Sequence, residues 1–61
     1  MKLKIEIKMD NAAFEPDSGT ECSRILGALS ADYDGRDLLP GESIALVDYN
    51  GNKVGSAKVT R

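Results

Sequence analysis

The sequence predicts an α+β fold of order β-α-β-β, in which three strands form one sheet and a single helix packs on one face. Three observations predict it: a period-two apolar pattern at the N-terminus, an amphipathic helical stripe in the middle, and Asn50-Gly51 between two strand-like segments near the C-terminus. The 61 residues make one small domain, 1–61. A domain of this size buries only about 60% of the surface of its unfolded chain, which leaves a homodimer and a monomer both open.

Residues 2–9 alternate between apolar and charged side chains, which is typical of a half-buried strand. The apolar positions are Leu3, Ile5, Ile7 and Met9, and the charged ones are Lys2, Lys4, Glu6 and Lys8. Residues 10–17 then form a connection, in which we expect Phe14 to be buried and to cover one end of the core. The alternation contains no continuous apolar run, so a signal peptide and a membrane span are not expected here.

A helix is predicted over residues 19–34. Ser18 and Glu21 have the spacing of a capping box, in which each side chain would accept a hydrogen bond from the other residue's amide. Gly35 suits the left-handed conformation that commonly ends a helix. The apolar residues follow at helical spacing, and we expect them to face the sheet: Cys22, Ile25, Leu26, Leu29 and Tyr33.

The connection after this helix contains Pro40-Gly41, which predicts a turn, and Leu38 and Leu39, which we expect to fold back on the core. Strands are predicted over 43–49 and 53–60, joined by a two-residue loop at Asn50-Gly51 in which both residues have positive φ.

The two-residue loop sets a register for this hairpin. It places Val47 opposite Val54, and Asp48 opposite Lys53 as a favourable cross-strand charge pair. The first two strands are parallel if the crossover is right-handed, so we favour the strand order 1-3-2, which has only antiparallel neighbours, over an order with strand 1 beside strand 2. The helix-facing side would then carry Leu3, Ile5, Ile7, Ile44, Leu46, Ala57 and Val59.

The other face of the predicted sheet has no element to cover it. Its first strand is basic, whereas the acidic residues lie mainly in the helix and its flanking loops. Such a face suits a partner or an anion, although the lysines could also serve only as a solvated guard against edge-to-edge aggregation. The candidate partner-binding residues are Lys4, Lys8, Val47, Tyr49, Val54 and Lys58.

The sequence offers no sign of an enzyme, a metal site or a cofactor. It has no histidine, so Cys22 lacks an evident base to activate it, and it lies on the predicted buried stripe of the helix. The segment 32–37 matches only a fragment of a calcium-binding loop. The net charge of −2, with Tyr49 as the only aromatic residue on the predicted open face, argues against nucleic-acid binding.

Three segments together resemble a group of short, uncharacterised open reading frames of bacteriophages and prophages. They are Met9-Asp10-Asn11-Ala12-Ala13-Phe14, Arg24-Ile25-Leu26 with Leu29, and Asn50-Gly51-Asn52-Lys53-Val54-Gly55. This resemblance covers most of the chain. It implies an accessory phage protein that acts in the cytoplasm of a bacterial host. The sequence departs from the group in the helix, where Gly27 and Ala28 replace long polar residues.

The expected function is therefore that of a non-enzymatic binding module. It would contact a host protein, or a second copy of itself, through the open sheet face or a strand edge. The alternative is a sequestering protein that holds an anionic nucleotide at the seam of a dimer.

Overall fold

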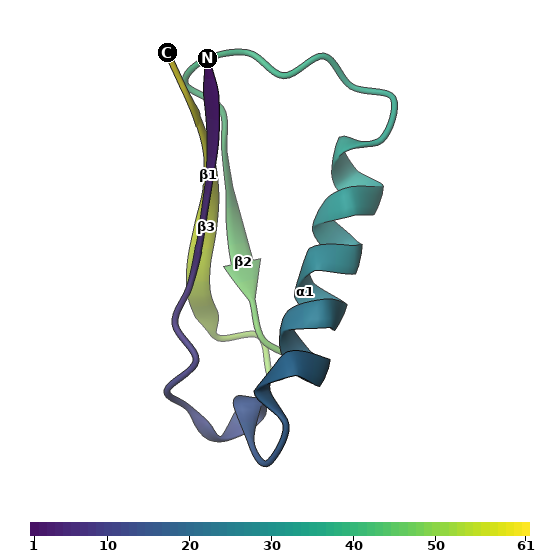
Figure 1. Ribbon diagram of the computed structural model, residues 1–61, viewed down its shortest axis with the longest axis vertical. Helices are drawn as coiled ribbons and strands as arrows, with labels where there is room; N and C mark the ends of the chain where they lie inside the picture. Colours follow the sequence, from purple (N-terminus) through teal and green to yellow (C-terminus); the bar gives the residue numbers. More distant parts are fainter.

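The computed structural model describes residues 1–61 and shows one helix packed beside a three-stranded sheet (Figure 1). The strand order is β1-β3-β2 and both pairings are antiparallel, so the predicted α+β fold and strand order are confirmed. The elements are β1 (Lys2–Ile7), the 3-10 helix η1 (Ala12–Phe14), α1 (Ser18–Tyr33), β2 (Ser43–Val47) and β3 (Lys53–Thr60).

The sheet keeps the predicted register as far as Leu46, which pairs with Gly55. The next residue, Val47, pairs with Lys53 instead of Val54, so Val54 is the extra residue of a β-bulge. The expected pairings of Val47 with Val54 and of Asp48 with Lys53 are therefore wrong. A bulge shifts the strand by one residue, and this shift turns Val54 from the open face into the core.

The hairpin loop is also wider than the predicted two-residue turn. The Asp48 amide donates to the Asn52 carbonyl at 2.9 Å and the Gly51 amide to the Asp48 carbonyl at 3.0 Å, which leaves a three-residue loop, 49–51. Only Gly51 has positive φ, at +87°, and Asn50 does not. The Asp48 carboxylate explains the difference, because it accepts both the Asn50 and Asn52 amides and so holds the wider turn.

The ends of α1 agree with the predicted helix to within one residue, but its N-terminal cap differs. Asp17 caps the helix by accepting from the amides of Gly19 and Thr20, so the expected capping box of Ser18 and Glu21 is wrong. The Glu21 carboxylate instead accepts hydrogen bonds from the Arg24 guanidinium and the Tyr49 amide. At the other end Gly35 has φ +78°, as the predicted cap requires.

The connection from α1 to β2 contains the predicted turn. Gly41 has φ +97°, and the Glu42 amide donates to the Leu39 carbonyl at 3.2 Å, which is the geometry of a turn with proline second and glycine third. The turn projects Leu39 outward, where 60% of its surface is exposed, so the expectation that it folds onto the core is wrong.

The core lies between α1, β2, β3 and η1, and Phe14 closes one end of it with only 2% of its surface exposed, as predicted. The helix approaches the sheet at its N-terminal end and diverges from it toward its C-terminal end (Figure 1). It packs against β2 and η1. The buried apolar cluster consists of Ala13, Phe14, Ile25, Leu29, Leu46, Val54 and Ala57.

This tilt leaves part of the predicted core uncovered. Leu3 and Ile5 remain 44% and 43% exposed, and Leu26 on the helix remains 43% exposed, so their expected burial is wrong. The cause is that α1 packs against β2, which leaves the apolar side of β1 beyond the reach of the helix. The helix does not have the length and apolar character needed to cross a membrane.

Candidate protein-binding surface

All five lysines of the chain are exposed, and they gather on or beside the open face of the sheet. Lys4 in β1 lies directly opposite Lys58 in β3, and Ser43 of β2 flanks Lys58 on its other side. Two like charges directly opposite each other on one sheet face destabilise the sheet. The Lys4–Lys58 pair therefore does not stabilise the sheet, but its two positive charges are well suited to binding a negatively charged partner. The five are Lys2, Lys4, Lys8, Lys53 and Lys58.

A shallow hollow of about 280 Å³ lies at the hairpin end of this face. Lys8 and Lys53 line it together with Ser56, and Glu6 is the only acidic residue among its walls. The strands approach closely here, because a Cβ atom on Gly55 would lie 1.8 Å from the Glu6 carbonyl oxygen. Gly55 therefore allows β1 and β3 to pair at this position, which brings Lys8 beside Lys53.

The structure brings together only part of the candidate set. Lys4, Lys8 and Lys58 lie on the open face, as predicted. Val54 is 94% buried in the core, so its expected place on that face is wrong because of the bulge. We call the exposed cations Lys2, Lys4, Lys8, Lys53 and Lys58 the lysine face.

The other two candidate residues lie at the margin of the sheet, near α1. Val47 is 44% exposed, and its carbonyl accepts a hydrogen bond from the Arg24 guanidinium at 3.0 Å. Tyr49 is 62% exposed and lines a second hollow, of about 290 Å³, between the hairpin and the start of α1. Tyr49 therefore belongs to a separate surface from the lysine face.

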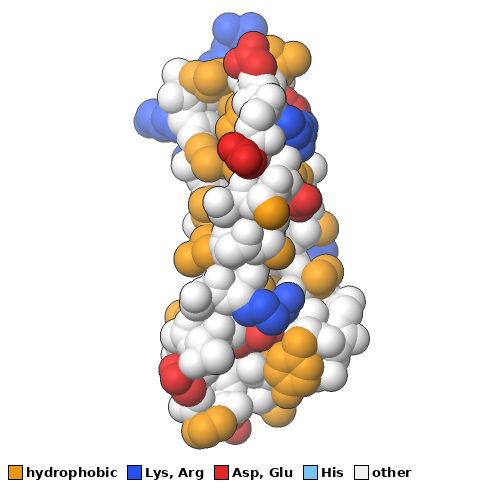
Figure 2. Space-filling model, turned by 90° about the vertical axis from the view of Figure 1, so that its right-hand side faces the viewer, with side chains coloured by type: hydrophobic (Ala, Val, Ile, Leu, Met, Phe, Trp, Pro, Cys, Tyr) orange, Lys and Arg blue, Asp and Glu red, His pale blue; other side chains and the backbone are white.

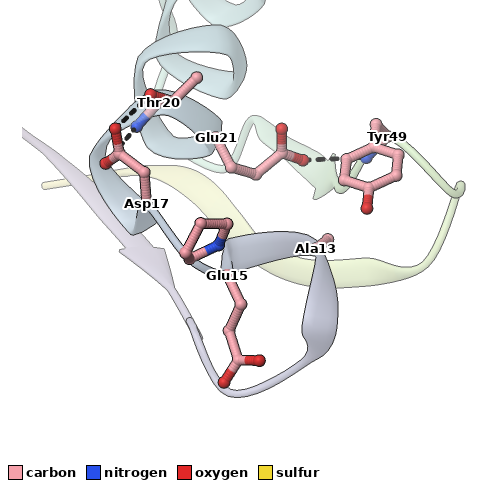
Figure 3. A pocket seen from close by; sticks show the side chains of 7 residues that line it. Ala13, Glu15, Asp17, Thr20, Glu21 and Tyr49 are labelled. Atoms are coloured by element: carbon pink, nitrogen blue, oxygen red, sulfur yellow. Dashed lines mark hydrogen bonds between the residues drawn. The ribbon is translucent and has the colours of Figure 1, made fainter.

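The second hollow is acidic, but two of its three carboxylates already stabilise the fold (Figure 3). Figure 3 shows Glu21 reaching from α1 toward Tyr49, whose amide donates to it at 2.9 Å, while Glu15 points away. Arg24 binds the same Glu21 carboxylate through two hydrogen bonds of 2.9 Å. Asp17 caps the helix. Sequence reasoning missed this contact between helix and hairpin, since no local pattern links Glu21 to residue 49.

Asp48 is a second buried carboxylate, 2% exposed, that connects distant segments. Its Oδ1 accepts from the amides of Asn50 and Asn52, both at 2.9 Å. Its Oδ2 accepts from the side chain of Asn11 at 2.8 Å and from that of Asn52 at 3.3 Å. Asn11 also caps η1 by accepting from the Ala13 amide. Asp48 thus ties the hairpin to the segment that carries Phe14.

Hydrogen bonding lowers the pKa of both carboxyl groups. For Glu21 the bonds from Arg24 act most strongly and the Tyr49 amide adds to them, against the opposing effect of burial. For Asp48 burial pushes the pKa upward, but the donors on Asn52 and Asn11 outweigh it. Both side chains are therefore charged at neutral pH and bind their donors as anions.

These shifts predict a loss of stability in acid. Because the folded-state pKa values lie below the ordinary values of 4.5 for Glu21 and 3.8 for Asp48, their stabilisation is complete above those values. It is lost as pH falls through the lowered values. We expect Tm, measured by circular dichroism, to change little near neutral pH and to fall progressively below about pH 4.5.

The replacement Asp48→Asn separates this effect from general acid denaturation. We expect this variant to have a lower Tm at neutral pH, because its new NH₂ group faces the N–H donors that the carboxylate accepts in the wild type. Its Tm should also fall less steeply in acid, because residue 48 no longer titrates. Asp37→Asn, at an exposed position, is the control and retains the wild-type profile. A profile for Asp48→Asn as steep as that of the wild type would contradict the assignment.

No family model, curated protein or solved structure matches the chain in comparisons with known proteins. The structure itself has an exposed basic face on its sheet, together with carboxylates that are already engaged in structural hydrogen bonds.

Proposed function

We propose that the protein is a non-enzymatic binding module, of the phage accessory type that the sequence resembles, and that it binds an acidic surface of a host protein through the lysine face. The observation that supports this most strongly is the opposition of Lys4 and Lys58 across two strands. An acidic partner would neutralise both charges at once and so relieve their repulsion.

The distribution of opposite charge supports the same function. Glu6 is the only acidic residue in the three strands, whereas the remaining nine of the ten acidic residues lie in α1 and the connecting segments. A module with one basic face is oriented by the field of an acidic partner before contact, which raises the rate of association and fixes which side docks.

The experiment compares two variants that each remove one positive charge. Binding to a polyglutamate peptide is measured by calorimetry at low salt for the wild type, Lys58→Gln and Arg36→Gln. We expect Lys58→Gln to weaken binding about two- to fivefold, the effect of one exposed charge pair. Arg36, which pairs with Glu42 away from the sheet face, is the matched control and has a smaller effect.

Folding is monitored in the same samples by Tm. Lys58→Gln should retain or slightly raise Tm, because it removes the like-charge opposition to Lys4. Equal weakening by the two variants would show that only net charge matters, and the proposal would then fail.

The hollow beside Lys8 and Lys53 favours a second candidate function, the capture of an anionic nucleotide. Two ammonium groups and the Ser56 hydroxyl are suitable partners for a phosphate group. A ligand that binds only the folded state raises Tm, so a panel of mono- and dinucleotides should produce an increase that Lys53→Gln abolishes. An unchanged Tm with every nucleotide would eliminate this candidate.

A further inference from the structure

The outer edge of β1 has its backbone groups free to pair with another strand. Lys8 donates its amide to the Val54 carbonyl at 2.8 Å, so the even-numbered residues of this segment direct their backbone groups toward β3. Backbone groups alternate along a strand, so Leu3, Ile5 and Ile7 direct theirs outward. The other edge of the sheet differs, because Arg24 occupies the carbonyl of Val47 at the end of β2.

The same edge carries exposed apolar surface. Leu3 and Ile5 project toward the helix side of the sheet but are 44% and 43% exposed, because α1 does not cover them. Leu26 on α1 is similarly exposed. Figure 2 shows exposed hydrophobic side chains on both sides of the helix. A strand edge with apolar side chains and free backbone groups is a ready template for pairing.

The charges of β1 are complementary to those of a second β1 that runs antiparallel to it. We infer that a second copy of the chain pairs antiparallel with β1 about a two-fold axis at Ile5. In this register Ile5 meets Ile5, Leu3 meets Ile7, and Lys4 meets Glu6 twice. The residues whose backbone groups point outward are the ones that this register places in hydrogen-bonded pairs.

The neighbouring hydrogen-bonded registers place like charges opposite each other at the two-fold axis. The next register in one direction sets Lys4 opposite Lys4 at the axis, with Lys2 opposite Glu6 on both sides. The next in the other direction sets Glu6 opposite Glu6, with Lys4 opposite Lys8 on both sides. Like charges directly opposite are destabilising. In the inferred register the only like-charge pairs join Lys2 to Lys8, and Lys8 lies beyond the end of β1.

The dimer has a continuous sheet of six strands, twice the three of one chain. Both lysine faces then lie on the same side of it, and both helices lie on the other. The inference rests on the strand edge alone and does not require the proposed function.

The experiment reverses the charges of residues 4 and 6, one at a time and together. Mass is measured by light scattering over a concentration series for the wild type, Lys4→Glu, Glu6→Lys and the double variant. The wild type is expected to reach twice the 6.5 kDa chain mass as concentration rises. Each single variant turns both Lys4–Glu6 pairs into like-charge pairs and should raise the dimer dissociation constant about tenfold or more. The double variant restores both pairs and should dimerise as the wild type does.

A mixture of the two single variants provides the decisive comparison. Each is impaired alone, but Lys4→Glu paired with Glu6→Lys recovers both opposite-charge pairs, so the mixture should form a heterodimer. Circular dichroism establishes that each variant is folded. A wild type that stays monomeric at millimolar concentration, or single variants that dimerise as well as the wild type, would overturn the inference.

Discussion

Replacing Gly55 with alanine is expected to unfold the protein or to detach β1. The new Cβ atom would lie 1.8 Å from the Glu6 carbonyl oxygen and 3.0 Å from the Ile7 Cα atom, both of which are backbone atoms. Backbone in a paired strand cannot move aside without breaking the pairing. Overpacking a core costs about 1–3 kcal/mol or more, which is comparable to the roughly 3–5 kcal/mol that a core of this size supplies.

The measurement is a thermal and urea unfolding curve for the variant and for Gly27→Ala. Gly27 is the matched control, because a Cβ atom there would meet nothing within 4 Å. Alanine is preferred to glycine within a helix, so Gly27→Ala should raise the free energy of unfolding by up to about 1 kcal/mol. A Gly55→Ala variant that melts within a few degrees of the wild type would show that the two strands do not approach as described.

Replacing Phe14 with alanine is expected to cost about 3–5 kcal/mol, which also approaches the whole stability of the chain. The ring is 2% exposed and closes the end of the core between α1 and the hairpin. No other large side chain of η1 can fill the cavity that remains. We expect little or no cooperative unfolding transition for this variant in urea at 25 °C.

Leu39→Ala is the control for this second variant. It also removes a large apolar side chain, but one that is 60% exposed, so the urea midpoint should change little. Similar destabilisation by the two replacements would contradict the position of Phe14 in the core.

The sequence predicted the elements whose signals are local. Alternation along residues 2–9, the stripe through Ile25 and Leu29, and Pro40-Gly41 each depend on neighbours in the chain, and the structure confirms them with small changes of boundary. The strand order followed from the chain connections and the preference for antiparallel neighbours. These features survive because no distant contact competes with them.

The errors arose where a side chain found a distant partner. Glu21 fitted a local capping box but binds Arg24 and the Tyr49 amide. Asp48 has the spacing for a charge pair with Lys53, but its carboxylate instead binds the distant Asn11 side chain together with the amides of the hairpin loop. The bulge that places Val54 in the core follows the wider loop, and no period-two pattern could reveal it.

Only the part of the candidate surface that lies in regular strands could be predicted from the sequence. Lys4 and Lys58 lie in regular strand segments and Lys8 directly follows β1, so their common face follows from alternation. Val54 lies at the bulge and Tyr49 in the loop, where the alternation ends. Val54 is therefore in the core and Tyr49 lines the second hollow. The exposure of Leu3 and Ile5 depends on the tilt of α1, which is set by packing rather than by any sequence pattern.

The lysine face is most directly tested by following the backbone amide signals of the ¹⁵N-labelled protein by NMR as a polyglutamate peptide is added. The account predicts chemical-shift changes concentrated at Lys4, Lys8, Ser56 and Lys58 and reduced by high salt. Changes centred on Glu21 and Tyr49, or spread evenly over the molecule, would contradict it.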